Sequence, residues 1–183
     1  MLRALADYNE SRRGAGKKAI DIGVGINTDT IVSGNIGSPK RMDYTVIGDG
    51  VNLASRLESA CKEYSAQILC SEFTYRKLKG TYRMREIDLV IVKGKTEPIG
   101  VHEVLDFHTE ETFPHMPEVI GLFRGGLGYY RKGEFDRAIK QFQEAIALHP
   151  GDKLSTTYIG RCEYLKAHPP EGPWDGVWVM KSK

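Results

Sequence analysis

Short runs in which apolar and polar residues alternate fill the first part of the chain and predict strands. Between residues 20 and 26 every second residue is isoleucine or valine, a period of two that is typical of a strand. A turn sequence at residues 27–29, the apolar pair at 31–32 and the segment 41–47 (RMDYTVI) predict a hairpin with a glycine-containing connection. We therefore expect this part of the chain to contribute strands to a sheet.

A helical period follows the predicted hairpin. Within residues 51–64 the apolar residues Leu53, Leu57 and Cys61 recur every four positions, so they form one apolar face of a helix. Further along, the pattern predicts a buried strand at 67–70, a short helix from 71 to 78, and strands at 85–92 and 101–107. Because strands and helices are interleaved, we expect an α+β sandwich.

The strand pattern stops after residue 107. Residues 108–117 (HTEETFPHMP) are polar and contain two prolines, which indicates a domain boundary. Beyond them the spacing predicts two helices within residues 119–149, split at Lys132-Gly133-Glu134, and another helix from 153 to 166. We therefore expect a first domain over residues 1–107, a linker over 108–117, and an all-α helical tail over 118–183 that contains a helical hairpin.

Composition and charge exclude several classes of function. The 183 residues are 40% hydrophobic and 27% charged, as in soluble globular proteins. A formal net charge of +2 gives no basis for a nucleic-acid binder or a polybasic membrane patch. No run approaches the roughly 18 apolar residues that a membrane span needs. The three cysteines lack C-x-x-C spacing, so we expect reduced thiols in a cytoplasmic protein, without a disulfide framework or a zinc site.

One long motif indicates a function. Residues 23–58 (GVGINTDTIVSGNIGSPKRMDYTVIGDGVNLASRLE) resemble the second half of the class III adenylyl and guanylyl cyclase catalytic domain. The resemblance continues through the strand at 67–70 and the turn at 92–94 to the strand at 101–107. It implies an incomplete ferredoxin-like sandwich with an antiparallel-rich sheet. It also implies a dimeric enzyme that converts ATP to cAMP and pyrophosphate, with its sites at the subunit interface.

The resemblance assigns roles to four residues. Asn52 would orient the ribose, and Arg56 would stabilise the charge that builds on the transferred phosphate. Lys93 would contact the triphosphate, and Thr45 would select the purine, where threonine favours an adenylate cyclase; a guanylate cyclase is the alternative. From the residues alone, Asn52 and Arg56 equally fit a solvated helix face, Lys93 an ordinary turn and Thr45 a β-branched strand position.

The resemblance also implies two divalent ions, Mg²⁺ or Mn²⁺, held by two aspartates in the first half of the family domain. Those positions would fall before Met1, and no aspartate here lies in a matching context: Asp21, Asp29, Asp43 and Asp88 are scattered. We therefore expect this sequence to lack the metal site. Alone it should make no cyclic nucleotide, because it needs the missing N-terminal half of the domain, from its own or another chain.

The helical tail resembles one tetratricopeptide repeat of about 34 residues followed by the first helix of a second. The residues at its key positions are Leu122, Gly125, Gly126, Tyr129, Ala138, Phe142, Ala145 and Pro150. This resemblance implies a surface for a protein partner or for dimer organisation. The alternative is a helical pair that packs on the cyclase domain. A rival function for the whole chain is a catalytically silent interaction module that uses this tail.

Overall fold

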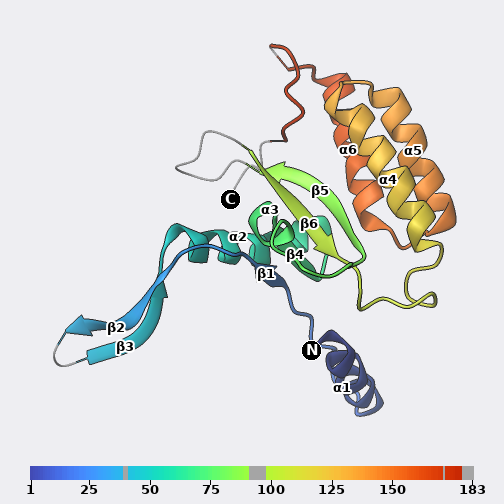
Figure 1. Ribbon diagram of the computed structural model, residues 1–183. Coiled ribbons are helices and arrows are strands. Elements are labelled where there is room, and N and C mark those ends of the chain that lie inside the picture. Colours follow the sequence, from blue (N-terminus) through green and yellow to red (C-terminus); the bar gives the residue numbers. More distant parts are fainter. Residues whose placement is uncertain (39–40, 91–97, 171, 179–183) are drawn as a thin grey trace.

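The computed structural model describes residues 1–38, 41–90, 98–170 and 172–178. Its elements, in chain order, are α1 (Leu2–Gly14), β1 (Val24–Ile26), β2 (Val32–Ser38), β3 (Arg41–Ile47), α2 (Asp49–Tyr64), β4 (Ile68–Ser71), α3 (Glu72–Tyr75), β5 (Met84–Val90), β6 (Ile99–Val104), α4 (Met116–Arg131), α5 (Phe135–Leu148) and α6 (Lys153–Ala167). These described residues form two sheets and six helices, which confirms the predicted α+β class (Figure 1).

The main sheet has the strand order β1-β4-β6-β5. β1 pairs in parallel with β4, and β6 pairs antiparallel with both β4 and β5. The parallel pair is joined by a crossover that contains α2, as parallel strands require. β1 is shorter than the strand predicted over residues 20–26, since Asn9 bonds the backbone of Ile20 through both its amide nitrogen and its oxygen at 2.8 Å.

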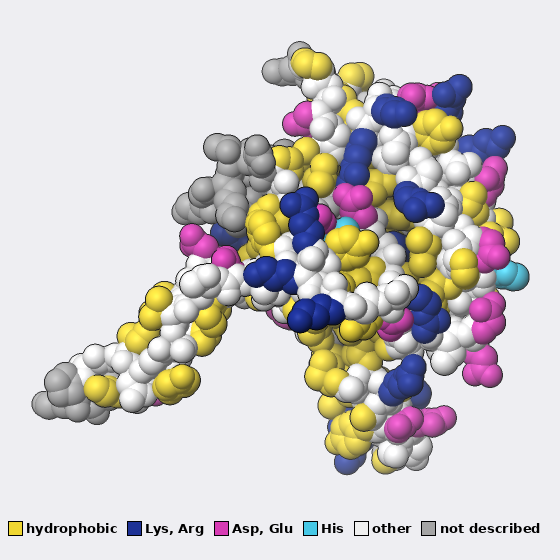
Figure 2. Space-filling view, in the orientation of Figure 1, with side chains coloured by type: hydrophobic (Ala, Val, Ile, Leu, Met, Phe, Trp, Pro, Cys, Tyr) yellow, Lys and Arg dark blue, Asp and Glu magenta, His cyan; other side chains and the backbone are white. Residues whose placement is uncertain are grey.

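The predicted hairpin is confirmed as β2 and β3, which pair antiparallel from Val32 and Ile47 to Ser38 and Arg41. It projects away from the main sheet in Figure 1, and Figure 2 shows hydrophobic side chains along it. Val32, Met42 and Tyr44 are 69%, 59% and 75% exposed. A two-stranded hairpin is at best marginally stable by itself in water. The described residues therefore leave an unusually apolar surface uncovered on this arm.

Helix α2 lies directly against β1. Leu53 and Leu57 are buried on its inner face, as the helical period predicts. Gly25 of β1 faces the same helix so closely that a Cβ there would lie 2.1 Å from the carbonyl oxygen of Ala54 and 2.4 Å from the amide nitrogen of Glu58. The backbones of helix and strand are thus in contact, which is possible only because residue 25 has no side chain.

The three C-terminal helices pack on the sheet. Figure 1 shows α4 and α6 between the sheet and α5, and the helices predicted within residues 119–149 and 153–166 are confirmed. A single hydrophobic cluster joins Leu57 of α2 and Ile87 of β5 to Phe123, Tyr130 and Tyr158 of the C-terminal helices. The described residues on the two sides of segment 108–117 therefore share a core; the boundary predicted there stays a prediction.

A buried ion cluster crosses between these two parts. The Arg85 guanidinium on β5 lies 2.7 Å from Glu103 on β6 and 2.8 Å from Asp152, the residue before α6. All three are buried. Ser155 donates to the second carboxylate oxygen of Asp152 at 2.5 Å. Arg85 also stands over the Phe123 ring, 5.0 Å from its centre. This cluster fixes the start of α6 against the sheet.

The three cysteines are free and buried. Burial raises the pKa of Cys70 to about 11 and that of Cys162 to about 12. A thiol with so high a pKa carries almost no thiolate at neutral pH, so these two side chains act as packing groups.

The contact between β1 and α2 predicts the effect of one methyl group. Gly25→Ala should lower the free energy of unfolding by about 1–3 kcal/mol or more, because an overpacked backbone contact must open. Gly34→Ala, on β2, is the matched control, because a Cβ added there would meet nothing within 4 Å and neither substitution changes charge. Urea denaturation of both variants checks this. Equal unfolding midpoints for the two would contradict it.

Candidate functional site

Asn52 and Arg56 project from the outer face of α2, one helical turn apart. Both are exposed, whereas Leu53 and Leu57 beside them are buried against the sheet. Residues four apart lie on one face of a helix, and their neighbours face about 100° away from them. The structure therefore brings these two predicted site residues together on a surface that a ligand can reach.

The Arg56 guanidinium has no hydrogen-bond or ion-pair partner within the described ranges, and neither does the Asn52 amide. Other arginines differ: Arg85, Arg131 and Arg161 all lie within 3.2 Å of a carboxylate. A guanidinium stays charged at every ordinary pH and presents planar donors that match phosphate oxygens. Arg56 is thus an arginine whose donors are available to an anion.

The other two predicted residues lie elsewhere. Thr45 is on β3, opposite Gly34 of β2, and is exposed. It is carried by the projecting hairpin, and its position relative to Arg56 depends on the run of β3 through Gly48 into α2. Lys93 lies outside the described residues. Only Asn52 and Arg56 are therefore placed side by side by the fold.

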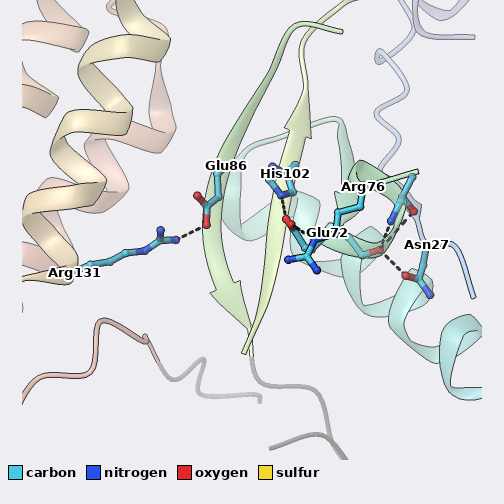
Figure 3. Close-up of polar contacts among 8 residues, drawn as sticks. Asn27, Glu72, Arg76, Glu86, His102 and Arg131 are labelled. Carbon is cyan, nitrogen blue, oxygen red and sulfur yellow. Dashed lines mark hydrogen bonds and ion pairs between the residues drawn. The ribbon is translucent and has the colours of Figure 1, made fainter. Parts of the chain in front are cut away.

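A polar junction that the sequence did not reveal fixes the first turn of α2. The Asn27 amide donates to the Gly50 carbonyl oxygen at 3.0 Å. Ser71 donates to the Asn27 oxygen at 2.5 Å (Figure 3). Ser71 in turn accepts from the amide of Thr74 at the start of α3. Asn27 thus joins the end of β1 to two helix starts. Its position in a turn was visible in the sequence, but its partners are 23 and 44 residues away.

A groove of about 890 Å³ lies between α3, the edge strand β5 with its neighbour β6, and α4. On its floor His102 contacts Glu72 at 2.5 Å and stacks on Tyr75, and at its far wall Arg131 bonds Glu86 at 2.7 Å (Figure 3). No sequence spacing pointed to this groove, because its walls are distant in sequence. It does not include Asn52, Arg56 or Thr45.

The charge of Glu72 is set by its neighbours. Burial alone raises the pKa of this carboxyl, but hydrogen bonds from His102 and Arg76 outweigh it, so the pKa lies below its ordinary value. Arg76 holds the second carboxylate oxygen at 2.7 Å. Glu72 is therefore an ionised group, and each of its two carboxylate oxygens is bonded to a neighbouring side chain.

The donor set does not fit a divalent ion. Within the described ranges, no three His, Cys, Asp or Glu side chains gather as a metal site requires. Asp88, the buried member of the four aspartates, is already bonded by Tyr64 at 2.5 Å and by Arg161 at 2.7 Å. The oxygen ligands that Mg²⁺ or Mn²⁺ prefers are thus dispersed or occupied.

Comparison with known proteins agrees with the motif. The family model of the adenylate and guanylate cyclase catalytic domain matches residues 1–107. The terminal-differentiation-specific adenylate cyclase of Dictyostelium discoideum is 36% identical over 148 residues, which cover 79% of this chain and 7% of that protein. This match is too long to end at residue 107, so it includes part of the C-terminal helices. The adenylate cyclase of Anabaena cylindrica is 40% identical over 111 residues, 57% of this chain and 22% of that protein.

Two solved structures are also similar. The adenylyl cyclase CyaB from P. aeruginosa is 37% identical with a TM-score of 0.49, over 57% of this chain and 53% of that one. The guanylyl cyclase Cya2 is 35% identical with a TM-score of 0.47, over 55% and 50%. The chain thus spans about half of these structures and less than a quarter of the two curated relatives. Because both TM-scores are below 0.5, the family assignment rests on the sequence match.

The exposure of the two α2 side chains predicts that they contribute little to folding. Asn52→Ala and Arg56→Ala should each change the free energy of unfolding by no more than about 0.5 kcal/mol, as for other unpaired surface residues. Leu57→Ala, on the buried face of the same helix, should cost about 2–5 kcal/mol. Urea denaturation of the three variants checks this. A loss above about 2 kcal/mol for Arg56→Ala would show a structural role instead.

Proposed function

We propose, since this chain belongs to the adenylate and guanylate cyclase catalytic domain family, that it is part of an adenylate cyclase that converts ATP to cAMP and pyrophosphate. The observation that carries this proposal is the pair Asn52 and Arg56, exposed side by side on α2 without partners within the described ranges. Neither side chain is held by the fold, so both are available to a polyphosphate ligand, as the proposed roles require.

The reaction assigns each of the two residues a task. The 3′-hydroxyl oxygen of ATP bonds to the α-phosphorus, the bond from that phosphorus to the pyrophosphate oxygen breaks, and the hydroxyl proton leaves. Arg56 stabilises the negative charge on the phosphoryl oxygens as the new bond forms. Asn52 holds the ribose so that its hydroxyl is aimed at the phosphorus, which lowers the entropic cost of reaching that geometry.

Two further residues complete the proposed substrate site. Thr45 contacts the purine and favours adenine, and Lys93 contacts the triphosphate. Family membership by itself leaves a guanylate cyclase as the alternative, and the names of the two curated relatives, both adenylate cyclases, favour ATP. Threonine at position 45 supports the same choice.

The proposed metal requirement is met from outside these 183 residues. Members of the family use Mg²⁺ or Mn²⁺, which supplies charge neutralisation at the triphosphate when bound. The scattered aspartates here do not fit such a site, so we propose that its ligands come from the first half of a cyclase catalytic domain, on the same polypeptide or on a partner subunit of a homodimer.

The exposed side chains of the projecting hairpin support the proposal that a partner subunit binds this chain. Its exposed Val32, Met42 and Tyr44 are the kind of apolar surface that monomers rarely leave open. The hairpin runs directly into α2 through Gly48, so a subunit that covers it would also stand beside the Asn52 and Arg56 face. We therefore propose that the substrate site lies at a subunit interface.

The proposed location is the cytoplasm. No helix in the part of the chain that the structure describes is long and apolar enough to cross a membrane. ATP and reduced thiols, such as those of the three free cysteines, are both typical of that compartment. A tetratricopeptide-type partner at the helical tail stays a prediction.

Complementation tests the proposed activity. The chain, mixed with the first half of the catalytic domain of a curated relative, should make cAMP from ATP with Mg²⁺ or Mn²⁺, and the chain alone should make none. In the mixture Arg56→Ala should lower kcat/KM about 100-fold or more, because a donor to the developing charge is lost. Arg137→Ala, an exposed arginine on α5, is the control. Loss within a few-fold for Arg56→Ala would refute its role.

The same mixture tests nucleotide choice. Single-turnover rates with ATP should exceed those with GTP by about tenfold or more, as a site built to bond one purine edge rejects the other. Formation of cGMP at a rate equal to or above that of cAMP would favour the guanylate cyclase alternative and would remove the purine-selecting role of Thr45.

A further inference from the structure

Arg161 of α6 is buried where the C-terminal helices meet the sheet. Its side chain is 5% exposed and donates to Asp88 of β5 at 2.7 Å and to Glu63 of α2 at 3.2 Å. Its guanidinium also lies over the rings of Tyr64 and Tyr158, at 5.3 and 5.0 Å. One side chain of the C-terminal helices thus touches both the sheet and the helix that carries the candidate site residues.

The end of α2 is held by the same group. Tyr64, the last residue of α2, donates its hydroxyl to the Asp88 oxygen that Arg161 also bonds. Burial, together with the negative charge of Asp88, raises the pKa of Tyr64, so the phenol keeps the proton that it donates. The final turn of α2 is therefore tied to β5 and α6 through one carboxylate.

The start of α2 is held differently. Its N-terminal residue has no side-chain cap, and among the described residues its first turn is bonded to the rest of the fold through the Asn27 amide. A helix rises 1.5 Å and turns 100° per residue, so Arg56 lies about 10 Å along the axis from Glu63. Because the helix is stiff over this length, displacement of its last turn displaces Arg56 as well.

Two tryptophans of the C-terminal segment contact the helices around Arg161. Trp174 donates to the Tyr130 carbonyl oxygen at 2.8 Å and packs on Phe135, and Trp178 lies over Arg161. Two aromatic side chains of the C-terminal segment thus contact the last turns of α4, the start of α5 and Arg161 of α6.

We infer that Arg161 is a positioning residue, through which the three C-terminal helices set the axial and rotational position of α2 and hence the placement of Asn52 and Arg56. The effect on turnover rests on the proposed function, but the mechanical coupling of α6 to α2 does not. The C-terminal helices therefore contribute to the position of the proposed substrate site. Removing the contact of Arg161 with Asp88 and Glu63 loosens α2 but removes no group that touches substrate.

Hydrogen exchange on the full chain tests the coupling. Arg161→Met alone leaves Asp88 buried and unpaired, so the main variant is the double substitution Arg161→Met with Asp88→Asn, which removes both charges together. Amides of residues 58–64 should exchange about tenfold faster than in the wild type, at a temperature at which both proteins are folded. The matched control Arg137→Met, which breaks an exposed pair on α5, should leave these amides unchanged.

A conservative variant covers the case in which the double variant does not fold. Arg161→Lys keeps the charge beside Asp88 but lacks the planar fork that also reaches Glu63. It should fold and still exchange faster over residues 58–64. Wild-type exchange over residues 58–64 in the folded double variant, or in Arg161→Lys if the double variant is unfolded, overturns the inference.

Kinetics separate positioning from stability. In the complemented enzyme the double variant should lose about tenfold in kcat while KM stays within about twofold, since a displaced Arg56 weakens transition-state contacts more than ground-state binding. A purely structural role would leave kcat per folded molecule unchanged. If the wild-type mixture makes no cyclic nucleotide, the proposed function fails, and the exchange measurement still decides whether Arg161 holds α2.

Discussion

The charge of Arg161 cannot be removed by deprotonation at any ordinary pH, yet its side chain is almost wholly buried. Taking such a charge out of water costs several kcal/mol, which only close, well-oriented partners offset. Asp88 and Glu63 are those partners, and the three aromatic rings around the guanidinium add attraction to their faces. If either carboxylate moved away, the buried charge of Arg161 would lose the attraction that offsets its removal from water. This ion cluster therefore constrains the relative positions of β5, α2 and α6.

Arg85 is a second buried arginine paired with carboxylates, and it lies at the start of α6. Its partners Glu103 and Asp152 come from a strand and from the residue before the helix. With one buried cluster at its start and one near its middle, α6 has a single way to lie on the sheet that leaves neither buried arginine without a carboxylate. Buried ion pairs of this kind are better understood as specifying an arrangement than as adding much net stability, because hydrophobic replacements are often as stable.

The C-terminal helices and the surface formed by the hairpin and α2 therefore differ in how far their side chains are buried and paired. On the C-terminal side, Arg85 and Arg161 are buried and paired with carboxylates, and Trp174 donates to the Tyr130 carbonyl oxygen. On the opposite side, the hairpin and the outer face of α2 expose apolar side chains and an unpaired arginine. An arginine lies in each of these two places. Arg161 is bonded by carboxylates, whereas Arg56 has no side-chain partner among the described residues. This asymmetry is consistent with the proposal that substrate and a partner subunit meet the chain at the hairpin and α2.

Local patterns in the sequence determined much of this. The period of two over residues 20–26 predicted a strand that includes β1, and the turn with the apolar segments after it predicted the hairpin of β2 and β3. The period near four predicted α2 with Leu53 and Leu57 inside, and the breaker residues separated α4 from α5. The family motif singled out Asn52 and Arg56, and helix geometry alone required that they share a face. Where a prediction was too long, local bonding explains it: the helix predicted to residue 78 ends as α3 at Tyr75, because the amides of Lys77 and Leu78 bond three residues back in tight turns.

The tertiary structure decided which distant residues meet. Arg85 and Asp152 are 67 positions apart, and Arg161 and Asp88 are 73 apart. The joining of Asn27 to both α2 and α3, and of His102 to Glu72, is equally remote in sequence. Sequence periodicity predicts only which residues share a face of one helix or strand. These contacts depend instead on which helices and strands lie side by side in the folded chain. The sequence thus showed which arginine belongs to the family motif, and only the packed fold showed which arginine holds that motif in place.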